Sequence, residues 1–194
     1  MIVHRIANSV FCSNTYIIHF ANSNKAWSID CGDADNIENY LGDNGLVLEG
    51  IMLTHTHYDH IYGLPRILGT YRCPVYTSIF GKTALANDRY NFSRYHGDPI
   101  SLESPLVMTI SEHEEIGLEG KHRMKVYETP GHDKSCLCFL IGEYLFTGDS
   151  FIPGIKVIAS FPNSDKKMAA RSHNFIKSLI TSETVVCPGH GDIL

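Results

Sequence analysis

Residues 54–60 constrain the fold most strongly, because they place three histidines and one aspartate directly after an apolar run. The run at 50–53 is typical of a buried strand, since its aliphatic residues end abruptly at polar ones. The residues that follow, 60–68, have the apolar spacing of a short helix. We therefore expect the cluster to lie on a loop at the carboxyl end of a strand, where open sheets bind their ligands.

The chemistry of this cluster indicates a metal site. In an extended backbone His55 and His57 project to the same side and can share one cation. Asp59 and His60, at the turn into the helix, point elsewhere and can serve a second cation. Imidazole and carboxylate ligands without thiolate suit zinc, iron or manganese, so the motif leaves the metal open. A polar loop that is rich in histidine by chance is the alternative, but this spacing rarely arises without a metal.

Three later strand ends repeat the pattern, each offering one further ligand next to a glycine. His132 follows the predicted strand at 124–128, Asp149 ends an apolar run at 145–148, and His190 follows another at 185–187. Four strand ends would then deliver seven candidate ligands to one rim: His55, His57, Asp59, His60, His132, Asp149 and His190.

The string His55-x-His57-x-Asp59-His60, followed in order by His132, Asp149 and His190, resembles the metallo-β-lactamase superfamily of metallo-hydrolases over essentially the whole chain. The chain is most similar to the glyoxalase II-like (hydroxyacylglutathione hydrolase-like) branch, on the strength of the segments 129–132, 146–149 and 188–191. The resemblance implies a fold of the α/β (α+β) class, a four-layer αβ/βα sandwich with the site at one edge.

The resemblance also implies how the ligands are shared. His55, His57 and His132 would hold a first metal ion, and Asp59, His60 and His190 a second. Asp149 would bridge the two ions, for which zinc is the expected metal and iron or manganese the alternatives.

The implied activity is that of a binuclear hydrolase, in which a hydroxide between the metals attacks a thioester, ester or lactone bond of a small-molecule substrate. Asp59 is the candidate catalytic residue, which would orient the hydroxide and move its proton. Two alternatives stay open: a mononuclear iron persulfide dioxygenase, which by resemblance would use only His55, His132 and Asp149, and a non-catalytic metal-binding module. Glyoxalase II enzymes carry a C-terminal glutathione-binding helical domain for which 194 residues leave no room, so a glutathione thioester is not the favoured substrate.

Length and composition predict one domain over residues 1–194. With 43% hydrophobic and 19% charged residues, the chain is not of a disordered type. A formal charge of −5 gives no electrostatic footprint for nucleic acid, and no run is long enough to cross a bilayer. The alternating residues 2–6 predict a strand rather than a signal peptide, so we expect a cytoplasmic protein, with its six scattered cysteines reduced.

Residues 88–105 are an unusual stretch, rich in aromatic and arginine side chains. We weigh two interpretations equally: a lid or substrate loop over the site, and a surface excursion packed by its own aromatics. In the first, Arg89, Arg94 and Tyr95 are the candidate substrate-binding residues, because arginine can clamp a carboxylate or phosphate. His96 is not expected to be a ligand, since the motif already fills the site.

The remaining pattern predicts a hairpin and an alternation of helices and strands. The acidic turn at 112–115 and its His113 are expected to be solvated. The predicted strands are 15–20, 25–30, 72–77, 107–110, 122–128, 136–141 and 143–146, and the predicted helices are 35–41, 78–87 and 166–180.

Overall fold

The computed structural model describes residues 1–194, which form two mixed sheets. The first has six strands in the order β1 to β6, antiparallel from β1 to β3 and parallel from β3 to β6. Its strands are β1 (Ile2–Ala7), β2 (Asn14–His19), β3 (Lys25–Ile29), β4 (Val47–Met52), β5 (Val75–Thr77) and β6 (Val107–Thr109).

The second sheet has five strands in the order β11-β10-β9-β8-β7. Neighbouring strands are antiparallel except β10 and β11, which run parallel. The strands are β7 (Glu115–Gly117), β8 (Arg123–Glu128), β9 (Leu137–Ile141), β10 (Tyr144–Gly148) and β11 (Val185–Pro188). A bridge between Ser13 and His190 joins the two sheets at the edge where β10 and β11 end.

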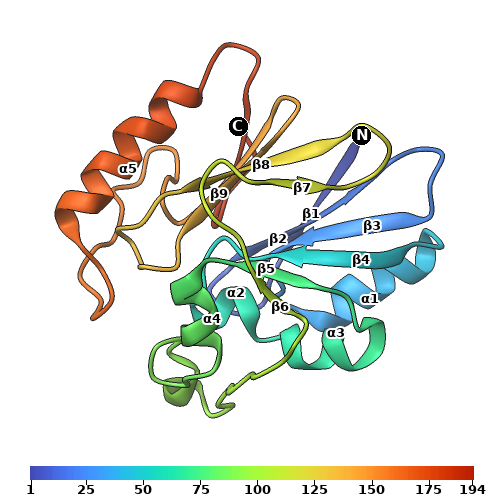
Figure 1. Cartoon of the computed structure of the whole chain (residues 1–194), viewed down its shortest axis with the longest axis horizontal. Helices are drawn as coiled ribbons and strands as arrows, with labels where there is room; N and C mark the ends of the chain where they lie inside the picture. Colours follow the sequence, from blue (N-terminus) through green and yellow to red (C-terminus); the bar gives the residue numbers. More distant parts are fainter.

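Helices cover the outer face of each sheet. They are α1 (Ala34–Asp43), α2 (Tyr58–Ile61), α3 (Leu64–Tyr71), α4 (Ile79–Leu85), the short 3₁₀ helix η1 (Ser93–His96) and α5 (Lys166–Leu179). In Figure 1, α1, α3 and α4 lie below the first sheet and α5 lies outside the second. The four layers are those of the αβ/βα sandwich, so the predicted fold class is confirmed.

Apolar side chains fill the three spaces between these layers. The largest cluster, 21 buried residues, lies between the first sheet and its helices. A second, of 14 residues, includes Tyr16, Trp27 and Phe139 and fills the space between the sheets. Strand β2 is buried along its whole length because Ile17 faces the first cluster and Tyr16 and Ile18 face the second.

Most predicted elements are present, with three differences. The helix expected over 60–68 is divided at Gly63 into α2 and α3, where a Cβ would lie 2.0 Å from the Gly32 carbonyl oxygen. The strand expected from Arg72 begins only at Val75, because Arg72 is left-handed (φ 49°) and ends α3. Part of the predicted acidic turn is strand β7, which was missed because three residues carry little periodicity.

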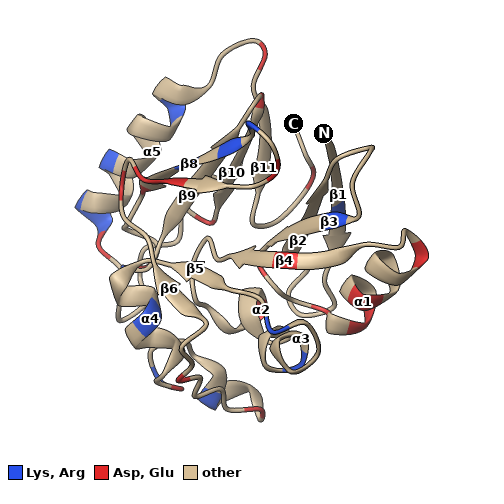
Figure 2. Ribbon diagram, turned by 45° about the vertical axis from the view of Figure 1, so that its right-hand side comes forward, with Lys and Arg blue, Asp and Glu red and all other residues tan.

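Two helices carry charged residues of opposite sign. Figure 2 shows the acidic residues of α1 at one end and the basic residues of α5 at the other. None of the helices has the length and hydropathy of a membrane span. All six cysteines are free, as expected, and only Cys12 is exposed.

Candidate metal centre

The seven candidate ligands lie together at one edge of the sandwich, each on the segment that follows a strand. His55, His57, Asp59 and His60 follow β4, and the last two belong to α2. The other three follow β8, β10 and β11 of the second sheet: His132, Asp149 and His190. Both sheets therefore contribute to one site, because their strands end at the same edge.

Three groups of three donor atoms form within this edge, each with its atoms within 4.8 Å of one another, and one of them, His55, His60 and Asp149, links the other two. The first is His55, His57 and His132, in which the His57 Nδ1 and His132 Nε2 atoms are 3.0 Å apart. The second is Asp59, His60 and His190. In that group Asp59 Oδ2 lies 3.4 Å from His60 Nε2 and 3.3 Å from His190 Nε2.

Asp149 lies between the two groups and faces both. Its Oδ2 is 3.5 Å from His132 Nε2 and 3.4 Å from His190 Nε2, and its Oδ1 is 3.7 Å from His60 Nε2. Gly189 makes room for this carboxylate, since a Cβ there would lie 2.1 Å from Asp149 Oδ1. The position therefore accepts no larger residue without moving Asp149.

The donors fit divalent cations. His55 Nε2 and Asp149 Oδ1 are buried and have no hydrogen-bond partner within the protein, and both belong to the candidate groups. Buried polar atoms are rarely left unpaired, so these two require a partner at the centre of the cluster. Five imidazoles and two carboxylates are ligands suited to zinc, iron or manganese.

The outer nitrogen of each histidine faces a polar group behind it, and such a group sets which nitrogen faces the centre. Four histidines turn Nε2 inward, whereas His57 turns Nδ1 inward and places Nε2 outward, 3.5 Å from Asp133 Oδ2. The outer partners of the other four are Thr54 Oγ1 for His55 (3.1 Å), Asp30 for His60 (2.9 Å), the Ile158 carbonyl for His132 (2.7 Å) and the Phe11 carbonyl for His190 (3.1 Å).

Sequence reasoning missed the two carboxylates in this outer ring. Asp30 ends the predicted strand 25–30, and its carboxylate accepts hydrogen bonds from the Thr54 amide and hydroxyl, both at 2.7 Å. Asp133 is fully buried, and its Oδ1 accepts from the Ser135 amide (2.8 Å) and hydroxyl (2.6 Å). The only available signal for Asp133 was its position directly after His132.

This arrangement of fold and site is matched by one family model, described as the Metallo-beta-lactamase superfamily, over residues 13–190. The chain belongs to the metallo-beta-lactamase superfamily. The match begins at the residue that bridges to His190 and ends at His190 itself, so it includes every candidate ligand.

Individual superfamily members are similar at moderate identity. A hydroxyacylglutathione hydrolase of Hydrogenovibrio crunogenus is 29% identical over 142 residues, which are 72% of this chain and 46% of that protein. The chain thus spans about half the length of such curated relatives. The solved structure of BLEG-1, a B3 metallo-beta-lactamase, has a TM-score of 0.90 at 26% identity and covers 100% of this chain and 93% of that one. TTHA1623 in a di-iron-bound form has a TM-score of 0.83 at 26% identity, covering 99% and 94%.

The protonation of the cluster follows from its crowding. Burial, together with four neighbouring imidazoles, holds the pKa of His55 well below its ordinary value. Burial also opposes protonation of His60, but Asp59, Asp30 and Asp149 outweigh it and raise its pKa to about 9. Asp149 and Asp59 likewise overcome burial and raise the pKa of His190 to about 10. The second donor group, Asp59, His60 and His190, therefore favours positive charge. A bound cation would supply this charge in place of protons.

The pocket over the candidate metal centre has a volume of about 240 Å³. The loop that contains residues 88–105 contributes Phe92 and His96 to its lining, whereas Arg89, Arg94 and Tyr95 are exposed and do not line it. Arg94 is paired instead with Asp88 at 3.1 Å. His96 stacks on Tyr58 and belongs to neither donor group.

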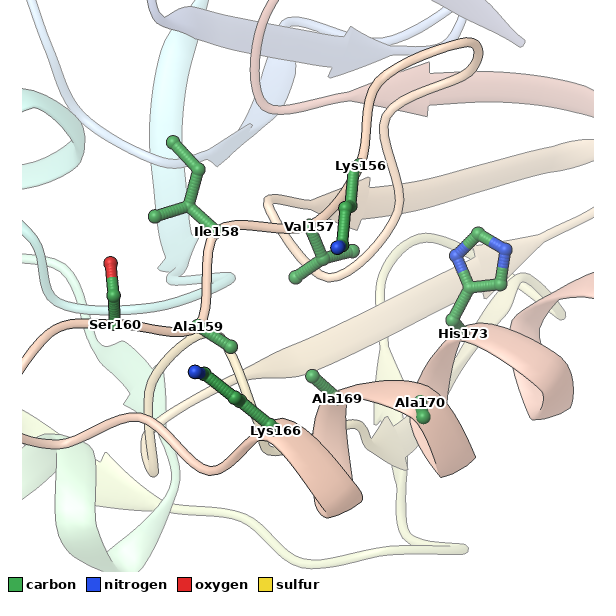
Figure 3. A pocket seen from close by; sticks show the side chains of 9 residues that line it. All are labelled: Lys156, Val157, Ile158, Ala159, Ser160, Lys166, Ala169, Ala170 and His173. Atoms are coloured by element: carbon green, nitrogen blue, oxygen red, sulfur yellow. The ribbon is translucent and has the colours of Figure 1, made fainter.

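A second, larger cavity of about 590 Å³ lies behind one wall of the pocket, between residues 156–160 and α5. Figure 3 shows the side chain of Ile158 turned away from Ala159 and Ala169. Ile158 lines both cavities, so residues 156–160 separate the site from this groove. None of the seven candidate ligands lines the groove.

Proposed function

We propose that this superfamily member is a binuclear metal-dependent hydrolase that cleaves a thioester, ester or lactone. The observation that carries the proposal is the position of Asp149, whose two oxygens face His60 of one donor group and His132 of the other. Two adjacent groups that share one carboxylate suit a pair of ions. The di-iron form of the similar protein TTHA1623 supports the same arrangement.

Divalent ions held there would supply a nucleophilic hydroxide near neutral pH and would polarise the carbonyl of the substrate. The residues of the chain provide the rest. Asp59 lines the pocket and is nearly buried, so its carboxylate is positioned to orient the attacking water and to accept its proton. Asp30 and Asp133 keep His60 and His57 in the orientations that the site requires.

The persulfide dioxygenase is the competing proposal. It would use His55, His132 and Asp149, and would leave Asp59 and His190 without a metal role. The second donor group argues against it, because Asp59 and His190 converge on His60, which is itself oriented by Asp30. A non-catalytic module would not need Asp59 to line an open pocket.

Elemental analysis of protein purified without added metal or chelator tests these proposals directly. We expect about two metal ions per chain, zinc or a mixture of zinc, iron and manganese, with hydrolysis of thioesters, esters or lactones in a screen. One iron per chain, with oxygen uptake on glutathione persulfide, would establish the dioxygenase instead. No metal, even after reconstitution, would leave the non-catalytic module.

Substitution of Asp59 tests its catalytic role. Loss of a positioned acid–base group reduces rates by about 10²–10⁴-fold, so we expect kcat of Asp59→Asn to fall in that range. The control is His113→Ala, because His113 lies on an exposed turn outside the pocket lining. Turnover of Asp59→Asn close to that of the wild type would remove Asp59 from the mechanism.

A further inference from the structure

The mouth of the candidate metal pocket is formed by large apolar side chains that no core cluster includes. We define the apolar rim as Phe11, Phe92, Ile158 and Phe161, which all line the pocket. Phe11 is 65% exposed, Ile158 54% and Phe161 40%. Large apolar side chains that are exposed together around a pocket are typical of a binding surface.

The rim begins directly at the candidate ligands. The Phe92 ring centre lies 4.9 Å from that of His57, and the Phe161 ring centre lies 5.3 Å from His57. Phe92 and Phe161 are also in contact with each other, with ring centres 5.6 Å apart. A substrate whose reacting bond lies among the histidines would therefore place its neighbouring substituent against these rings.

Two of the rim residues are held in strained backbone. Phe11 has φ 53°, the following Cys12 has φ 54°, and Phe92 has φ 62°. The left-handed region is unfavourable for a non-glycine residue, and such strain concentrates at functional sites. At Phe11 the same turn directs the carbonyl to His190 Nδ1, so one backbone conformation both orients a candidate ligand and presents an aromatic ring to the pocket.

Away from the metal donors, the pocket lining has no fixed cation that could pair with an anionic substituent. It contains no lysine or arginine, and its carboxylates are Asp59 and Asp149. Arg94 is the arginine closest in sequence to Phe92, and its guanidinium is paired with Asp88. A carboxylate or phosphate held at the rim would find no lysine or arginine there, whereas an uncharged apolar group would find three aromatic rings.

We propose that the substrate carries an uncharged apolar acyl group, aliphatic or aromatic, which the apolar rim holds beside the bond that is cleaved. The inference rests on the proposed hydrolysis and names the substrate class of that same site. Each methylene that the rim removes from water strengthens binding about fourfold. With two to three methylenes buried, a six-carbon acyl group should bind roughly 16- to 64-fold more tightly than an acetyl group.

Hydroxamates test the rim without requiring turnover, because their head group binds metal and their chain can be varied. Dissociation constants are measured by calorimetry on zinc-reconstituted protein for acetohydroxamate, hexanohydroxamate and adipic monohydroxamate. The last matches hexanohydroxamate in chain length but ends in a carboxylate. We expect hexanohydroxamate to bind more than tenfold tighter than either of the others. Equal affinity, or preference for the carboxylate, would overturn the proposal.

Substitution then assigns the preference to the rim. Phe161→Ala should reduce the affinity ratio of hexanohydroxamate to acetohydroxamate by about five- to tenfold, whereas Tyr95→Ala, outside the lining, should leave the ratio unchanged. Matched hexanoyl and acetyl thioesters of one thiol give the corresponding kcat/KM ratio. If the hydroxamates follow the expected order and no thioester, ester or lactone is hydrolysed, the hydrolase proposal fails and the rim stands. If thioesters are hydrolysed without preference for hexanoyl, only the rim fails. If no hydroxamate binds, both fail.

Discussion

Asp133→Asn should weaken metal binding at the first donor group while leaving the fold intact. The carboxylate of Asp133 faces His57 Nε2 at 3.5 Å, and neither Asp133 Oδ2 nor His57 Nε2 has another partner. The asparagine keeps the size of the side chain, and its oxygen can still accept from the Ser135 amide and hydroxyl. Its NH₂ group would then face His57, which favours a proton on Nδ1, the nitrogen needed for the metal.

The expected magnitude follows from the role of outer carboxylates in metal sites. Loss of one such partner reduces metal affinity by about 10- to 100-fold, which is about 1.4–2.7 kcal/mol. We expect the upper half of this range, because His57 has no second group to hold Nε2. Only one of the two ions should be affected, since His57 belongs to the first donor group alone.

Competition between the apoprotein and a chromophoric zinc chelator measures this effect as two stepwise affinities. Lys134→Ala is the control, because the adjacent lysine directs its amine over Phe80, 5.6 Å from the ring centre, and away from His57. Asp30→Asn should instead weaken the site of His60. If both affinities of Asp133→Asn stay within twofold of the wild type, Asp133 does not orient His57. A circular dichroism melt separates this result from misfolding.

Three further predictions concern the rest of the molecule. Ellman's reagent should label one thiol rapidly in the native protein and six in denaturant, because only Cys12 is exposed. Burial raises the pKa of Cys73 to about 11 and that of Cys138 and Cys187 to about 12. More than one rapidly labelled thiol would contradict the packing. Ser78→Ala should lower the free energy of unfolding in urea by about 1–2 kcal/mol, because the hydroxyl caps α4 through the Gly81 amide and donates to the Ser135 carbonyl; an unchanged midpoint would refute this. Chelation of the metal should lower Tm, because a ligand at 100 times its Kd stabilises the native state by about 2.7 kcal/mol; equal melting curves with and without zinc would show that no folded-state site is filled.

The sequence predicted the position of the donor groups because each signal is local. Every candidate ligand lies on the segment that follows a strand, so the strand and its polar end can be recognised within about ten residues. The convergence of four strand ends then follows from the geometry of an open sheet. The hairpin of β2 and β3 and the helix predicted over 166–180, which is α5, were accessible for the same reason.

Most of the groups behind the histidines were not predictable, because they come from distant parts of the chain. The Phe11 carbonyl that holds His190 is 179 residues away from it, and Asp30 is 30 residues from His60. A carbonyl carries no side-chain signal, and an aspartate in a turn has an adequate local explanation. In the 88–105 stretch, charge drew attention to the arginines, whereas the pocket is lined by Phe92 and His96, which the backbone conformation of the loop directs inward.

The parallel pairing of β10 with β11 has a consequence for the order in which the molecule assembles. Strand β11 is separated from β10 by α5 and its loops, and it also carries His190 into contact with the segment before β2. During synthesis, one edge of β10 therefore stays unpaired until β11 has left the ribosome. Residues 11–13 likewise stay unpaired until their partner, His190, has been made. Such late, long-range closure makes folding slow and leaves an edge exposed to pairing with other chains. The metal site thus cannot be completed before β11 has been synthesised and paired with β10.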